Sequence, residues 1–192
     1  TKLPVVTYAP IDCEPAPVEQ IETVQGAITN VAMSRHVQAK YAEAGCPTEY
    51  IPHFYDETVF KPMDRAECRQ VYGLSEDLFV FGSVATNMGN RKNLVNELWA
   101  YRDFLDRNPQ AKKDSMFFLH CDLTRNGANP KGMNLNLFIR DLGLGENCVY
   151  TNSFDYHNAL TDQHIASLYN CFDVLVQASC GEGFGLPIIE AG

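Results

Sequence analysis

Short apolar runs alternate with amphipathic stretches between residues 78 and 192. The apolar runs are rich in β-branched and aromatic residues, whereas the stretches between them repeat their apolar residues at helical spacing. We expect strands at 78–85, 115–121, 148–151 and 173–179, and helices at 94–105, 133–142 and 162–170. This alternation is typical of a parallel sheet whose strands are joined by crossover helices. The sequence therefore predicts an α/β fold, with a Rossmann-like parallel sheet that has helices on both faces.

The first 77 residues contain a separate strand and helix. Residues 28–34 are apolar and β-branched enough for a strand, and Ser34 can cap a helix at 35–44 that Gly45 ends. A polar, proline-bearing stretch with one short helix near 65–72 follows. We expect residues 1–55 to be the C-terminal part of a first Rossmann-like domain, 56–77 a linker between domains, and 78–192 a second domain. Because the chain begins without methionine and stops one turn into a helix, we expect it to be a piece of a longer protein.

A glycine-rich turn near the end of the chain carries the strongest functional signal. It lies between the apolar run at 173–179 and a helix that begins at Leu186. Gly183 and Gly185 allow backbone angles that other residues resist, so the main chain can approach a ligand closely. Free N–H groups at a helix start attract phosphate. The turn therefore predicts a phosphate site formed by the main chain from Phe184 to Leu186.

Two carboxylates flank this turn, eight positions apart. Glu182 stands before the turn, and Glu190 lies about one helical turn after it. Carboxylates accept hydrogen bonds from hydroxyl groups and are repelled by phosphate. Glu182 is therefore a candidate for binding the hydroxyls of a sugar, and Glu190 for binding a ribose. The alternative is an ordinary strand-turn-helix corner with a solvated glutamate at each end.

A second candidate site follows the strand at 78–85. The loop at 86–93 contains two adjacent cations, Arg91 and Lys92. In an open parallel sheet, ligands bind beyond the carboxyl ends of the strands. An arginine can contact two phosphate oxygens and a lysine adds a point charge, so the pair can neutralise a diphosphate. A basic pair near a helix start opposes the helix dipole, which favours a functional reason over a solvated surface pair.

Composition limits the remaining classes of function. The formal net charge of −9 argues against sequence-independent binding of nucleic acid. No apolar run approaches the roughly 18 residues that a membrane-spanning helix needs. Seven cysteines, an odd number without a Cys-x-x-Cys pair, suggest neither a disulfide framework nor a zinc site, and reduced thiols favour the cytoplasm. His120, Cys121 and Asp122 are consecutive on an expected strand and point to alternate faces, so we expect no metal there.

The stretch from Glu182 to Glu190 resembles the Glu-x7-Glu signature of retaining glycosyltransferases with the GT-B fold, specifically the large family 4. The resemblance extends to residues 165–176, which are similar to the helix and strand before that signature. It also includes residues 51–62, which are similar to the link between the two GT-B domains. On this basis the chain is expected to hold the end of the N-terminal domain and most of the C-terminal, donor-binding domain.

The resemblance implies a hexosyltransferase that uses a UDP- or GDP-sugar as donor, without a metal ion or other cofactor. Lys92 and Arg91 would hold the leaving diphosphate, Glu182 would orient the sugar, and Glu190 would bind the ribose. Thr151 and Ser153 would lie where the family holds the nucleobase. The acceptor would be a glycan or a lipid-linked molecule. The protein would be cytoplasmic, with peripheral contact to the inner membrane face through the part of the first domain that precedes this chain.

The sequence departs from the family pattern at two places. Asn87 stands about where the commoner pattern has an arginine after the strand, so we expect it to contact the donor in place of that arginine. Phe54 and Tyr55 replace a glycine and a small apolar residue in the link. Two other classes of function stay open. One is a GT-B sugar-nucleotide epimerase or phosphorylase, and the other is a nucleotide-binding module without catalysis.

Overall fold

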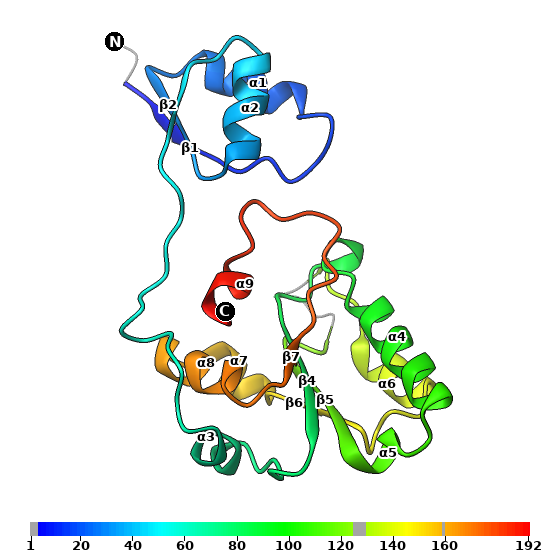
Figure 1. Ribbon diagram of the computed structural model, residues 1–192. Helices are drawn as coiled ribbons and strands as arrows, with labels where there is room; N and C mark the ends of the chain where they lie inside the picture. Colours follow the sequence, from blue (N-terminus) through cyan, green and yellow to red (C-terminus); the bar gives the residue numbers. More distant parts are fainter. Residues whose placement is uncertain (1–3, 125–129, 159) are drawn as a thin grey trace. The chain divides into compact units, whose positions relative to one another are not determined.

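The computed structural model describes residues 4–124, 130–158 and 160–192. The chain forms two compact units, each with its own parallel sheet and core (Figure 1). The first unit comprises residues Thr1–Tyr55 together with the short segment Gly181–Leu186, and the second comprises Asp56–Cys180 and Pro187–Gly192.

The first unit contains three parallel strands and two helices. Strands β1 (Val6–Tyr8), β2 (Thr29–Ala32) and β3 (Thr48–Tyr50) are adjacent in that order. Helices α1 (Val18–Gln25) and α2 (Arg35–Glu43) connect them and pack near one another (Figure 1). A small apolar core between the helices and the sheet consists of Ile11, Val24, Ala32, Val37, Tyr41 and Cys46.

The ends of α2 agree with the expectation from the sequence. The Ser34 side chain accepts a hydrogen bond from the Val37 N–H at 3.2 Å, which satisfies one of the free donors at the helix start. Gly45 follows the helix with φ +73°, a left-handed conformation that ends helices and that glycine adopts without strain.

The second unit is built on a four-stranded parallel sheet with the order β6-β5-β4-β7. Its strands are β4 (Phe79–Val84), β5 (Ser115–His120), β6 (Cys148–Tyr150) and β7 (Val174–Leu175). The run expected as a strand at 173–179 thus forms only a two-residue strand. Beyond the strand, the Val176 N–H still donates to the Gly82 carbonyl of β4 at 2.7 Å, whereas the Ala178 N–H donates to the Glu97 carboxylate at 3.0 Å.

Helices cover both faces of this sheet, as the sequence predicts. One face is covered by α4 (Leu94–Arg107), α5 (Ala111–Asp114) and α6 (Leu135–Asp141), and the other by α3 (Arg65–Val71) and α8 (Asp162–Tyr169) (Figure 1). Along the chain, η1 (Gly89–Arg91) follows β4, α7 (Ser153–Asn158) follows β6 and α9 (Leu186–Glu190) follows β7. Each face has its own apolar core.

Gly82, in the middle of β4, is required for packing on the α8 face. A Cβ atom at this position would lie 2.1 Å from the ring of Phe172, far inside van der Waals contact. The ring therefore fits directly against the strand backbone, and any larger residue at position 82 would displace it.

Helix α3 lies inside the stretch expected to link two domains, and it packs against α8 in the second unit. Its Arg69 side chain is fully buried. The guanidinium donates to the carbonyls of Cys171, Ser75, Glu76 and Leu78 and to the carboxylate of Asp173, at 2.8 to 3.1 Å. Arg69 thus ties α3 to the starts of β4 and β7.

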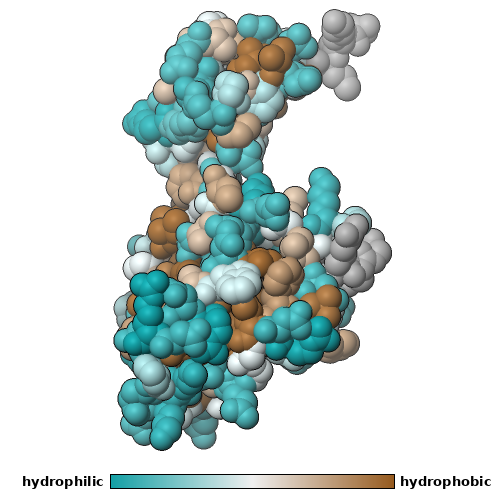
Figure 2. Space-filling model, turned by 90° about the vertical axis from the view of Figure 1, so that its right-hand side faces the viewer, coloured by the Kyte–Doolittle hydropathy of each residue, from teal (hydrophilic) through white to brown (hydrophobic). Residues whose placement is uncertain are grey.

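On the face drawn in Figure 2, hydrophobic side chains form small groups between hydrophilic ones. Among the described residues, no helix is both long and apolar enough to cross a membrane.

Candidate functional site

The carboxyl edge of the second sheet gathers the candidate residues that lie outside the glycine-rich turn and α9. The loop after β4 carries Asn87, Arg91 and Lys92, and the segment after β6 carries Thr151 and Ser153. All four strands are parallel, so these loops leave the sheet at the same edge. This is the edge where open α/β sheets bind ligands.

Lys92 lies at the end of η1 with only 9% of its surface exposed. Burial raises the pKa of the neighbouring Glu97 carboxyl group, and the Lys92 charge offsets part of that rise. Arg91 is partly buried, and its guanidinium lies 3.4 Å from the Met88 sulfur. Two left-handed residues, Gly89 with φ +55° and Asn93 with φ +57°, turn the chain on either side of this pair. The loop therefore presents two adjacent cations at the ligand-binding edge.

Hydrogen bonds join the cationic loop to the segment that follows β7. The Arg91 carbonyl accepts from the Cys180 N–H at 2.8 Å, and the Cys180 thiol lies 3.6 Å from the Asn90 carbonyl. A few residues earlier, the Ala178 N–H donates to Glu97 at the start of α4. The two segments thus form one connected structure at the edge of the sheet.

Glu97 is a buried carboxylate that the sequence analysis did not identify. It is 3% exposed, and burial raises its pKa, against the opposing effects of the Ala178 N–H, the Ser83 hydroxyl and Lys92. The Ser83 hydroxyl acts on the carboxylate by its proximity, since neither Ser83 Oγ nor Glu97 Oε2 meets hydrogen-bond geometry within the part of the chain that the structure describes. The sequence did hold a signal, because Glu97 interrupts the otherwise apolar stripe of α4.

Asn87 is buried, with 1% of its surface exposed. Its amide group donates to the Asp122 and Met133 carbonyls at 2.8 and 2.7 Å and accepts from the Met133 N–H at 2.9 Å. Both amide hydrogens are therefore used by the protein backbone. In this structure Asn87 fixes the loop after β4 against the segment before α6.

A histidine lies beside the segment expected to hold the nucleobase. His120 Nδ1 and Thr151 Oγ1 are 2.9 Å apart, and the His120 ring lies against Tyr156 of α7 with ring centroids 5.1 Å apart. Burial lowers the pKa of His120 to about 4, so its ring is neutral at neutral pH. The Thr151 N–H donates to the Leu119 carbonyl at 3.1 Å, and Ser153 is exposed at the start of α7.

The two carboxylates of the glycine-rich turn belong to different units. Glu182 lies in the segment grouped with the first unit, and Glu190 ends α9 in the second. The Tyr169 hydroxyl of α8 donates to Glu190 Oε2 at 2.8 Å and fixes the orientation of this carboxylate.

The backbone of the turn requires glycine at two positions. Gly185 has φ +85°, a value that side-chain-bearing residues rarely adopt, and Leu186 begins α9 directly after it. Gly183 leaves so little room that an added Cβ would lie 2.4 Å from Pro10. Phe184 packs edge-on against His53, with ring centroids 5.3 Å apart.

No group of three His, Cys, Asp or Glu side chains among the described residues could hold a metal ion. Asp122 and His157 form a pair whose Oδ2 and Nε2 atoms are 3.4 Å apart.

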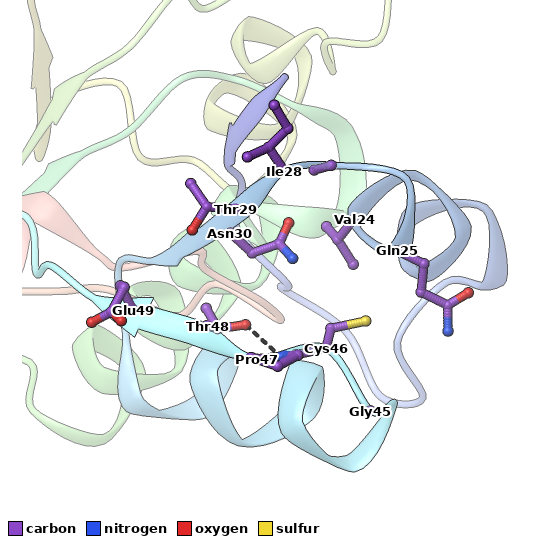
Figure 3. A pocket seen from close by; sticks show the side chains of 11 residues that line it. Val24, Gln25, Ile28, Thr29, Asn30, Gly45, Cys46, Pro47, Thr48 and Glu49 are labelled. Atoms are coloured by element: carbon purple, nitrogen blue, oxygen red, sulfur yellow. Dashed lines mark hydrogen bonds between the residues drawn. The ribbon is translucent and has the colours of Figure 1, made fainter. Parts of the chain in front are cut away.

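A separate cavity of about 280 Å³ lies in the first unit (Figure 3). Residues from the end of α1, the start of β2 and the start of β3 line it, and Thr48 donates to the Cys46 carbonyl at 2.9 Å within it. It lies at the amino ends of β2 and β3, the edge opposite to the one where parallel sheets bind ligands. The cavity offers one carboxylate, Glu49, and no cation, so it does not suit a phosphate.

No protein-family model matches the chain, and no curated protein sequence matches it. Solved structures do match its fold. Sucrose-phosphate synthase from Thermosynechococcus elongatus aligns with a TM-score of 0.72 and 19% identity, over 90% of this chain and 40% of its own. HepE from Anabaena, solved with UDP and glucose, aligns with a TM-score of 0.67 and 20% identity, over 98% and 50% of the two chains.

A third match is the trehalose-6-phosphate structure from E. coli bound with UDP-2-fluoro glucose. It aligns with a TM-score of 0.68 and 12% identity, over 93% of this chain and 46% of its own. The chain thus spans half or less of the length of these three structures. At these identities the likeness shows the fold, which is that of GT-B glycosyltransferases.

Proposed function

We propose that this chain supplies the donor-binding part of a glycosyltransferase that moves a hexose from a nucleotide-diphosphate sugar to an acceptor hydroxyl. The observation that carries the proposal is Lys92, a cation only 9% exposed beside Arg91 at the carboxyl edge of the sheet. Burying a lysine is costly unless an anionic group lies nearby. Glu97 supplies one negative charge nearby. Two adjacent cations also suit the two phosphates of a nucleotide diphosphate, because arginine and lysine both bind phosphate oxygens.

The fold supports the choice of ligand. Two of the matching structures were solved with UDP and glucose or with UDP-2-fluoro glucose. A donor bound in the same way here would place its diphosphate beyond the carboxyl ends of the strands. UDP- and GDP-sugars are the candidate donors, and the proposal requires no metal ion or other cofactor.

The proposed reaction retains the configuration of the sugar, as in family 4 of the GT-B glycosyltransferases. The bond between the anomeric carbon and the phosphate oxygen breaks, and its electron pair stays with the diphosphate. The acceptor oxygen forms its bond to the same face of that carbon and passes its proton to the leaving phosphate. Lys92 and Arg91 would stabilise the negative charge that develops on the diphosphate.

The remaining residues would bind parts of the donor. Glu182 would accept from the sugar hydroxyls and Glu190 from the ribose, while the main chain of Gly183, Phe184, Gly185 and Leu186 would contact the phosphates. Thr151 and Ser153 would hold the nucleobase. The Tyr169 hydroxyl bond to Glu190 supports the ribose role, because it fixes the carboxylate in one orientation. The hydrogen bonds of Asn87 favour a role in shaping the loop over the donor contact expected from the sequence.

The acceptor and the location belong to the same proposal. We propose a glycan or lipid-linked acceptor, and a cytoplasmic protein in peripheral contact with the inner membrane face. These assignments rest on the resemblance to family 4.

Calorimetric titration with UDP, GDP and ADP tests the proposed function. We expect one nucleotide to bind selectively, and both Lys92→Met and Glu190→Ala to weaken its binding at least tenfold. Lys113→Met is the matched control, because Lys113 is an exposed lysine on α5 of the same unit, and it should leave binding unchanged.

Turnover separates the alternatives once binding is established. A transferase releases the nucleotide faster when an acceptor is supplied, whereas an epimerase converts the nucleotide sugar without one. Binding without any conversion of UDP- or GDP-sugars by the complete protein would support a nucleotide-binding module. Absence of nucleotide binding by the folded protein would refute the proposed function.

A further inference from the structure

A buried carboxylate connects three segments beneath the candidate phosphate site. Glu97 projects from the first turn of α4 and is 3% exposed. Its Oε1 atom accepts from the Ala178 N–H, in the segment that leads from β7 to the glycine-rich turn. The Glu97 N–H donates to the carbonyl of Asn93, the residue directly after Lys92, at 3.2 Å, and the Lys92 charge acts on the Glu97 carboxylate. Glu97 is therefore in contact with one candidate phosphate-binding segment and electrostatically coupled to the other.

A carboxylate at position 97 destabilises the fold relative to an apolar residue. Its helix neighbours Leu94 and Leu98 are almost fully buried in the apolar core, and a leucine at position 97 would continue their stripe. Burying an ionisable group costs several kcal/mol unless charges and hydrogen bonds compensate it. Here one oxygen has the Ala178 N–H, while Oε2 makes no hydrogen bond within the described part of the chain. The Ala178 N–H, the Ser83 hydroxyl and Lys92 offset only part of this cost, because burial still leaves the pKa of Glu97 raised.

The charge of Glu97 also cannot serve to attract an anion. A negative charge behind Lys92 reduces the positive potential that a diphosphate would meet. What Glu97 can supply is geometry, because a flexible lysine gains a fixed position from a charge partner held rigidly in the core. Preorganised cations stabilise developing charge better than mobile ones.

We propose that Glu97 is a positioning residue for the donor diphosphate, which holds Lys92 and the segment at residues 178–180 in the geometry that the phosphates require. The inference rests on the proposed function, since it assigns the diphosphate as the group that Lys92 binds. Glu97 itself does not touch the donor. It acts through Lys92 and through the main chain at Ala178.

The test compares ligands that do and do not carry the second phosphate. UDP, GDP and the corresponding monophosphates UMP and GMP are titrated into the wild-type protein, Glu97→Gln, Lys92→Met and the double variant. Glutamine keeps the shape of the side chain and an oxygen for the Ala178 N–H but removes the charge. The ratio of diphosphate to monophosphate affinity for the preferred base is the quantity compared.

We expect Glu97→Gln to lower this ratio at least tenfold while leaving monophosphate affinity within about threefold of the wild type. In the Lys92→Met background, Glu97→Gln should have almost no further effect on the ratio, because residues that act through one another are not additive. Glu97→Asp, which retains the charge, should recover part of the ratio.

Three results would overturn the inference. One is an unchanged ratio in Glu97→Gln. Another is an equal loss of monophosphate and diphosphate binding, which would indicate general disruption of the fold. The third is a full, additive effect of Glu97→Gln in the Lys92→Met background. Failure of the proposed function is distinguishable from all three, because then the wild-type protein itself binds neither UDP nor GDP.

Discussion

Replacing Arg69 with methionine should destabilise the second unit more than any surface substitution. The guanidinium is fully buried and donates to four backbone carbonyls and to the Asp173 carboxylate. Methionine has a similar length but no donor, so these acceptors would lose their partner. Removing one member of a buried ion pair costs about 3–5 kcal/mol. Some of the freed carbonyls, at the exposed residues Ser75 and Glu76, can turn to water. We therefore expect a loss of about 4 kcal/mol, well below the sum over five bonds.

Urea denaturation measures this loss through the one tryptophan of the sequence, Trp99, which lies on α4 and reports on the second unit. With a slope of about 2 kcal/mol per molar urea, the midpoint should fall by about 2 M. Arg65→Met is the matched control, because Arg65 contacts the same Asp173 carboxylate with a side chain that is 46% exposed. We expect it to cost no more than about 1 kcal/mol. A loss below about 1 kcal/mol for Arg69→Met would refute the role of Arg69 as a buried connector.

Three further predictions concern protonation, loop structure and thiol access. The pKa of His120 falls from its ordinary 6.5 to about 4 on burial, so its neutral form is favoured in the folded state. The contribution of neutral His120 to the free energy of unfolding should therefore be fully present above pH 6.5, and about 3 kcal/mol of it should be lost as the pH drops towards 4. His120→Gln should remove this pH dependence, and an identical pH dependence in the variant would contradict the assignment. Asn87→Ala should cost about 2 kcal/mol and expose the Met133 amide to hydrogen exchange, and unchanged protection of that amide would show that the bond is dispensable. Iodoacetamide should modify the exposed Cys13 and Cys180 before the five buried cysteines, and bound nucleotide should protect Cys180 only; peptide mass spectrometry measures both, and equal protection of the two thiols would place the ligand elsewhere.

The sequence was most informative where a residue type has one well-defined structural role, such as capping or ending a helix. Ser34 and Gly45 marked the ends of α2, and both act there as expected. The apolar runs at 78–85 and 115–121 became β4 and β5, because a central parallel strand buried on both faces needs continuous apolar residues. The Rossmann-like arrangement with helices on both faces followed from the order of these runs.

Features that depend on long-range contacts were either missed or predicted with the wrong length. Strand β3 has only three residues and a polar sequence, and its pairing with β2 stabilises it. Strand β7 is shorter than its apolar sequence suggests, and the chain that follows it bonds to the Glu97 carboxylate through the Ala178 N–H. Arg69 reads as an ordinary surface residue of a short helix, and only the fold shows that carbonyls distant in the sequence surround it.

The candidate site was predicted in part. The loops with Lys92 and Thr151 do leave the same edge of the sheet, as the rule for parallel strands requires. The roles of Glu97 and Tyr169 could not be predicted from the sequence. Glu97 acts on Lys92 and Tyr169 binds Glu190, and both interactions exist only because the fold brings these residues together. Roles in binding and catalysis for the individual residues stay predictions.

Amide chemical shifts reveal which backbone segments a bound nucleotide contacts. The ¹H–¹⁵N spectrum of the protein would be recorded during titration with UDP and with GDP. The account predicts that one nucleotide shifts the amides of residues 86–93, 151–153 and 178–190, and that the amides around the cavity of the first unit, at Thr29 and Thr48, stay unchanged. Shifts confined to that cavity, or no shifts with either nucleotide, would contradict a nucleotide-sugar site at the carboxyl edge of the second sheet.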